Sequence, residues 1–69
     1  QSIITEEDIL EIELQDYARS RLKDIIDDQK ERRTYLYEIL EDDEINAMIK
    51  NKEIGKAKDY IDNLIRGLQ

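Results

Sequence analysis

The sequence predicts an all-α fold, a small helical bundle of three to four helices that dimerisation could complete. Proline and valine are absent, and the first glycine is Gly55. Apolar residues recur at steps of three and four, which is typical of amphipathic helices, and do not alternate as in a half-buried strand. We expect a single helical domain over residues 1–69. Because the chain begins with Gln1, we also expect a processed chain or a piece of a larger protein.

The first helix is expected to begin after Thr5. The stretch Thr5-Glu6-Glu7-Asp8 resembles a capping box, in which the threonine hydroxyl accepts a backbone N–H at the helix start. The carboxylates of the first turn also favour the positive end of the helix dipole. An apolar stripe then follows at helical spacing: Leu10, Leu14, Tyr17, Ala18, Leu22, Ile25 and Ile26.

A second helix is expected to begin near Asp28. If the first helix continued, the buried line beyond its stripe would be occupied by Gln29, Arg32 and Arg33, which would have to give up their contact with water. A break avoids this conflict, and Asp28 can cap a new helix over about 29–41. One long helix through residue 40 is the alternative.

Two more helices complete the expected bundle. Asp42 or Asp43 can cap a short one, which is expected to end at Asn51. The last is expected over about 53–67, with Gly67 as its C-terminal cap. The expected core combines residues from these stripes: Leu10, Leu14, Tyr17, Leu22, Ile25, Leu36, Leu40, Ile61, Leu64 and Ile65.

Several kinds of site are excluded by residues that the sequence lacks. Without cysteine or histidine, disulfides, ordinary zinc sites and histidine-based triads cannot form. There is no glycine-rich phosphate loop. The acidic stretch 41–44 lacks the spaced ligands and central glycine of an EF-hand, so we expect it to cap a helix. We therefore expect no enzyme activity, no metal and no cofactor.

The charge of the chain is acidic and arranged in blocks. The formal net charge is −7, which argues against direct binding to nucleic acid. Residues 1–18 and 34–49 carry acids and no base, whereas residues 19–33 and 50–69 carry more bases than acids. Such blocks favour antiparallel helix neighbours or a charged partner surface. No apolar run is long enough for a membrane span, and the lack of cysteine fits a cytoplasmic or nuclear location.

The basic block is the first candidate binding site. The stretch "DYARSRLKDI" brings Arg19, Arg21 and Lys23 at alternate positions, and Arg32 and Arg33 can add to the surface. An arginine fork can bind a partner's carboxylate in a bidentate geometry. Alternatively, nearby aspartates neutralise these cations in i,i+3 or i,i+4 pairs, each worth about 0.2–0.5 kcal/mol. A nucleic-acid-binding role for the same segment is a further alternative.

The tyrosines are the second candidate. Tyr35 and Tyr37 are two positions apart, which places them on nearly opposite sides of a helix. One of them is therefore expected outside the core, where a tyrosine ring is a common anchor at protein contacts. Tyr17 lies at the edge of the first stripe and joins the predicted partner-binding residues.

One short stretch carries a resemblance to a known family. "YARSRLKDI", preceded by "LEIEL", is similar to a Tyr-x-Arg-x-Arg-Leu-x-x-Ile pattern in the helical domain of GINS subunits, components of the replicative helicase assembly. The matching residues are Tyr17, Arg19, Arg21, Leu22 and Ile25. The similarity covers about a dozen positions, and the small β domain of that family has no counterpart. The resemblance implies a scaffold role in DNA replication, with no catalytic residues.

Together these observations predict a non-enzymatic module for protein–protein interaction or assembly. It would associate with itself or dock on another subunit through an apolar helix stripe, and a homo-oligomer is expected. The alternatives are a piece of a replication scaffold and a nucleic-acid-binding helical domain that uses the basic segment from Arg19 to Arg33.

Overall fold

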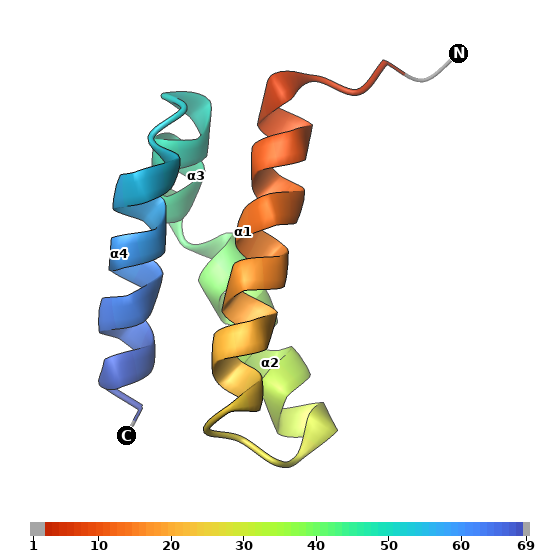
Figure 1. Ribbon diagram of the computed structural model, residues 1–69, viewed down its shortest axis with the longest axis vertical. Coiled ribbons are helices and arrows are strands. Elements are labelled where there is room, and N and C mark those ends of the chain that lie inside the picture. The colour runs from red at the N-terminus through yellow and green to blue at the C-terminus, as the bar shows by residue number, and fades with distance from the viewer. Residues whose placement is uncertain (1–2, 69) are drawn as a thin grey trace.

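The fold is an all-α bundle, as the sequence predicts. The computed structural model describes residues 3–68, and within that range the chain forms four helices and no strand: α1 (Glu6–Lys23), α2 (Gln29–Glu41), α3 (Asp43–Lys50) and α4 (Ile54–Arg66). Helices α2 and α3 return antiparallel to α1, and α4 then runs beside α1 in the same direction (Figure 1). Helix α1 contacts each of the other helices, so it is the centre of the bundle.

The capping box at the start of α1 is confirmed. The backbone N–H of Asp8 donates to Thr5 Oγ1 at 3.2 Å, and the N–H of Thr5 donates to Asp8 Oδ2 at 3.2 Å. These two bonds satisfy donors that have no partner inside the helix. The first helix therefore begins where its sequence predicts.

The predicted break between α1 and α2 is also confirmed, which rules out a single long helix. Helix α1 ends at Lys23, and the backbone is non-helical until Asp28. The Asp28 carboxylate accepts a hydrogen bond from the N–H of Lys30 at 3.0 Å and caps α2. The turn brings the basic residues of α2 back alongside those of α1.

Asp42 terminates one helix and starts another. It is the C-cap of α2 and the N-cap of α3, and its carboxylate accepts from the N–H of Glu44 at 2.8 Å. The hydroxyl of Tyr60 donates to the other oxygen of Asp42 at 3.1 Å, which links α4 to this corner. The capping role that the sequence indicates for the acidic stretch is therefore seen at Asp42.

The turn between α3 and α4 has a feature that the sequence did not predict. Lys52 has a φ of 61°, the left-handed conformation usually taken by glycine. The N–H of Lys52 donates to the carbonyl of Ile49 at 3.0 Å, and the N–H of Glu53 donates to the carbonyl of Met48 at 2.8 Å. This pattern closes the helix as a Schellman motif. The Lys52 ammonium also lies 3.0 Å from a carboxylate oxygen of Glu6, at the start of α1.

The core lies where all four helices meet and is entirely apolar. Half of the expected core residues are buried, and the others are partly buried and pack against them; Leu64 belongs to the second group. The buried set also includes small and branched residues that fill the centre, among them Ala18, Ile45 and Ala57. The complete buried core is Leu14, Ala18, Leu22, Leu36, Ile39, Ile45, Ile49, Ala57, Ile61 and Ile65.

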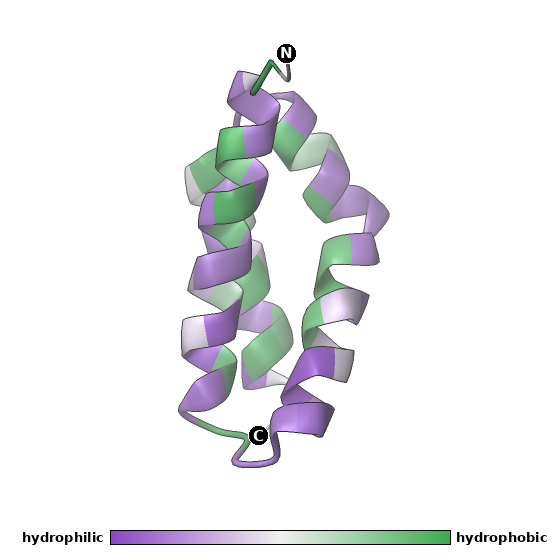
Figure 2. Ribbon diagram, turned by 90° about the vertical axis from the view of Figure 1, so that its right-hand side faces the viewer, coloured by the Kyte–Doolittle hydropathy of each residue, from purple (hydrophilic) through white to green (hydrophobic). Residues whose placement is uncertain are grey.

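Some apolar residues remain outside this core. The described residues before α1 begin with a hydrophobic stretch that projects from the end of the bundle (Figure 2). Ile3 and Ile4 in this stretch are 84% and 66% exposed, and Ile9 and Ile12 in α1 are more than half exposed. Over the described residues, no helix is both long and apolar enough to cross a membrane.

Candidate functional site

The residues predicted to bind a partner do not form one surface. Tyr17 and Arg21 face α4 and interact with Asp62. Tyr35 lines a cavity at the other end of α2 from α3. The remaining predicted residues line one groove between α1 and α2: Arg19, Lys23, Arg32, Arg33 and Tyr37.

Helix geometry explains why the basic run of α1 is divided. Residues two apart on an α-helix point about 200° away from each other, whereas residues four apart lie on the same side. Arg21 therefore faces away from Arg19 and Lys23. The alternating spacing in the sequence sends one cation toward α4 and two toward α2.

On the side of α1 that faces α4, here called the α4 side, the polar side chains contact each other. The Tyr17 hydroxyl donates to the Asp62 carboxylate, with distances of 2.8 and 2.9 Å to its two oxygens. The Arg21 Nε lies 3.2 Å from Asp62 Oδ1. The Lys58 ammonium sits 5.5 Å from the centre of the Tyr17 ring, close enough for a cation–π contact. Tyr17 and Arg21 thus hold α1 and α4 together, which gives them partners inside the chain.

The Asp62 carboxylate also changes the acidity of Tyr17. The pKa of Tyr17 is raised above 10.0, first because its hydroxyl donates a hydrogen bond to Asp62, then because the phenol is partly removed from water, and then because of repulsion between the phenolate and the Asp62 carboxylate. Arg21 acts in the opposite direction and is outweighed. The neutral phenol is therefore the form that this contact favours.

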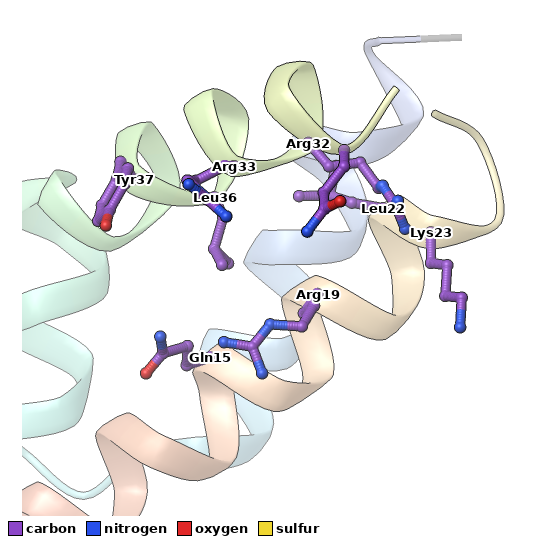
Figure 3. Close-up of a pocket in the computed structure, with 9 residues that line it drawn as sticks. Gln15, Arg19, Leu22, Lys23, Arg32, Arg33, Leu36 and Tyr37 are labelled. Carbon is purple, nitrogen blue, oxygen red and sulfur yellow. The ribbon is translucent and has the colours of Figure 1, made fainter. Parts of the chain in front are cut away.

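The α2 side is an open groove with a cavity volume of about 490 Å³. Residues of α1 and α2 lie on opposite sides of it, and Arg32 reaches across toward the last turn of α1 (Figure 3). Lys23 lies at the rim, with its ammonium directed outward (Figure 3). The floor is apolar, since Leu22 is fully buried and Leu36 nearly so. The lining residues are Gln15, Arg19, Leu22, Lys23, Gln29, Arg32, Arg33, Leu36 and Tyr37.

The charge of the groove is opposite to that of the whole chain. Four of its lining residues are cations and none is an acid, in a chain of net charge −7. Within residues 3–68, the ion pair formed by these cations is Arg19 with Asp16, at 3.3 Å. Both of these side chains are more than half exposed, so the pair contributes at most about 1 kcal/mol.

Arg32 has hydrogen-bonding capacity that the chain does not use. Its Nε is buried and has no hydrogen-bond partner among the described residues. A buried donor without an acceptor costs about 1–3 kcal/mol, and a guanidinium fork can donate two parallel bonds to one carboxylate. Among the four cations of the groove, Arg19 has an ion-pair partner within residues 3–68, and the other three lie above the apolar floor without one.

The two neighbouring tyrosines of α2 differ in exposure, as their spacing predicts. Tyr37 is 59% exposed at the end of the groove, whereas Tyr35 is partly buried and packs against the core. Tyr35 lines a second cavity of about 420 Å³. The charged residues of this cavity are all acidic: Asp27, Asp28 and Glu31. Of the two rings, Tyr37 is the one placed to contact a partner in the basic groove.

The acidic residues do not assemble into a metal centre in this part of the chain. Among residues 3–68, no three histidine, cysteine, aspartate or glutamate side chains are grouped so as to hold a metal ion. The acidic stretch 41–44 contributes Asp42 to helix capping and to the contact with Tyr60. These roles are structural.

The sequence did not predict that two residues of α4 contact Tyr17, one of the predicted partner-binding residues. Asp62 and Lys58 both contact Tyr17, and both lie in a segment whose prediction as a helix rested on its apolar stripe. They lie four positions apart, so both project from one side of α4. This spacing of a base and an acid beside the stripe was the available signal.

Comparison with known proteins adds no relative, because the chain matches no family model, no curated protein and no solved structure.

Proposed function

We propose that this chain is a non-enzymatic interaction module that binds an acidic segment of a protein in the groove between α1 and α2. One observation carries the proposal: four cations, and no carboxylate, line a groove in a strongly acidic chain. The partner is a second copy or another subunit. The cytoplasmic or nuclear location and the similarity to GINS subunits remain predictions.

The net charge of the chain does not oppose this interaction at short range. At physiological ionic strength, charges separated by more than about 8 Å are largely screened from each other. A carboxylate in the groove would therefore respond mainly to the cations around it. A hydrogen bond to a charged group contributes about 1.5–3 kcal/mol, so the loss of one such bond should weaken binding by about tenfold or more.

A peptide suits the groove better than a nucleic acid does. The groove extends over about two and a half turns of each helix, and the adjoining blocks 1–18 and 34–49 carry acids and no base. An extended polyanion would meet these acids on leaving the groove, whereas a short acidic segment would not. The floor of Leu22 and Leu36, with Tyr37 at its end, also favours a segment that carries apolar side chains.

The proposal is tested with a fluorescein-labelled peptide, Glu-Glu-Leu-Leu-Glu-Glu, and fluorescence anisotropy at low salt. We expect saturable binding that weakens as salt rises. The double variant R32Q/R33Q is expected to bind at least about tenfold more weakly, since it loses charge-assisted bonds worth more than about 1.4 kcal/mol. A peptide in which glutamine replaces glutamate should not bind.

The matched control is K50Q/R66Q, which removes the same charge from α3 and α4, outside the groove. We expect it to bind the peptide as the wild type does. Equal losses in the two double variants would show a diffuse charge effect and contradict a specific groove. A single-stranded DNA probe that binds in preference to the acidic peptide would favour the nucleic-acid alternative and overturn the proposal.

A further inference from the structure

The chain carries its own complement to the basic groove. We define the acidic arm as residues 3–12, which contain the acids Glu6, Glu7, Asp8 and Glu11 and no base. The same segment holds the most exposed apolar residues of the protein's N-terminal half: Ile3, Ile4, Ile9 and Ile12. It therefore combines carboxylates with apolar side chains, which is the chemistry that the groove is suited to bind.

A single chain cannot place this arm in its own groove. Both surfaces lie on α1, which is one uninterrupted helix. At 1.5 Å per residue, Ile12 is about 10 Å from Arg19 along the helix axis, and Asp8 is about 22 Å from Lys23. The helix holds the two surfaces apart at its opposite ends, so only another molecule can bring them together.

One side of α1 is complementary to itself when its direction is reversed. Asp8, Ile12, Gln15, Arg19 and Lys23 follow at steps of three and four, so they share one side of the helix. Placed antiparallel on a second copy, Asp8 lies opposite Lys23 and Ile12 lies opposite Arg19. Gln15 then falls near the middle of the pair.

We propose that the acidic segment bound by the groove is the acidic arm of a second copy, in a symmetric antiparallel dimer. This inference rests on the proposed function. A two-fold axis near Gln15 places both arms on both grooves at once, as an isologous interface requires. The aliphatic stem of Arg19 covers the exposed Ile12 of the other copy, and Asp8 meets Lys23. The dimer thereby covers two isoleucines and supplies carboxylates to two grooves.

The test is sedimentation equilibrium of the full chain over a wide range of concentrations. We expect a reversible monomer–dimer equilibrium whose dissociation constant rises with salt. R19E places an acid opposite the neighbouring acidic arm, and I12K places a base opposite Arg19. Each variant alone is expected to raise the dissociation constant at least about tenfold.

An equimolar mixture of R19E and I12K is the sharper experiment. In the mixed dimer the two substituted positions face each other with opposite charges, and the other Ile12–Arg19 contact is native. We expect the mixture to dimerise more strongly than either variant alone. Both side chains are more than half exposed, so the variants should keep the helical circular dichroism of the wild type.

The charge-matched control for R19E is K50E, on α3, which should leave the dimer unchanged. A wild type that stays monomeric at every concentration overturns the inference, as does a dimer that R19E, I12K and their mixture do not alter. Peptide binding distinguishes these failures from failure of the proposed function. A monomer that binds the acidic peptide through Arg32 and Arg33 still supports an interaction module, whereas one that does not bind it contradicts both proposals.

Discussion

On the side of α1 that faces α4, Tyr17 and Arg21 share the Asp62 carboxylate, with contacts between 2.8 and 3.2 Å. On the other side, α1 forms a groove with α2. Arg32 and Arg33 of α2 line this groove and have no ion pair within residues 3–68. On the first side, the polar groups form contacts that join α1 to α4. On the second side, Lys23, Arg32 and Arg33 form no ion pair within residues 3–68, as the proposed binding of an acidic segment requires.

This difference shows how one helix can place cations of the same kind in two different environments. Arg19 and Arg21 have the same chemistry and are separated by one residue, yet they face different neighbours. A cation whose partner is inside the chain contributes to folding, whereas several cations without a partner repel each other and do not. The two sides should therefore respond in opposite ways to substitution.

The largest effect is expected in the core that both sides share. Leu14 is fully buried, so L14A should lower the free energy of unfolding by about 2–5 kcal/mol. Leu64 is only partly buried, so L64A should cost clearly less. Urea denaturation measures both variants. Equal losses would mean that the packing around α1 differs from the structure described.

The next effect compares the two sides directly. D62A leaves the Tyr17 hydroxyl and Arg21 without their acceptor and should lower the free energy of unfolding by about 1–3 kcal/mol. R33Q removes an exposed cation of the groove and should change the free energy of unfolding by less than about 0.5 kcal/mol. Urea denaturation at the same ionic strength gives both values. A larger loss in the free energy of unfolding for R33Q than for D62A would contradict the claim that the Asp62 contacts stabilise the fold more than the groove cations do.

Alkaline pH should weaken the α4 side. The pKa of Tyr17 is raised above 10.0 in the folded protein, so folding favours the neutral phenol. This stabilisation is fully present below pH 10 and is lost as the pH rises through the folded-state pKa. The melting temperature of the wild type should fall more steeply above pH 10 than that of Y17F. Burial and Asp42 raise the pKa of Tyr60 in the same direction, and Tyr60 is present in both proteins. Parallel curves for wild type and Y17F would contradict the role of Tyr17.

The smallest effect on stability is expected at the rim of the groove. D16N removes the exposed carboxylate beside Arg19 and should change the free energy of unfolding by less than about 0.5 kcal/mol. The same change frees Arg19 from a competing acid, so binding of the acidic peptide should tighten. Anisotropy titration of D16N beside the wild type measures this gain. Weaker binding by D16N would show that Asp16 orients Arg19 rather than competing for it.

Most of the fold could be predicted because its signals are local. The capping residues Thr5, Asp28 and Asp42 mark the helix starts within a few positions of sequence, and the stripes identify the buried sides. The left-handed Lys52 was missed because lysine, unlike glycine, gives no sign of that conformation. Its turn is closed by backbone hydrogen bonds of the Schellman motif, which no local residue preference marks in the sequence.

The candidate site could be predicted only in part, because its membership depends on tertiary contacts. The basic residues were visible in the sequence, but their division between two sides requires knowing where α2 and α4 lie. Tyr17 was predicted both in the core and at a partner contact, and Arg21 at a partner contact. Their shared partner Asp62 lies 45 positions beyond Tyr17, and only the packing of α4 against α1 brings it beside them. The placement of Arg19 and Arg33 along one groove likewise depends on the turn at Asp28, which the sequence predicts, and on how the helices then pack, which it does not.

The measurement that tests the central claim most directly is a two-dimensional NMR titration of the isotope-labelled protein with the acidic peptide. If the groove is the binding surface and the α4 side is internally satisfied, the largest chemical-shift changes will fall on Arg19, Arg32, Arg33 and Leu36. The amides around Asp62 on α4 will then change little. Changes centred on Lys58 and Asp62, or spread evenly over all basic residues, would contradict the account.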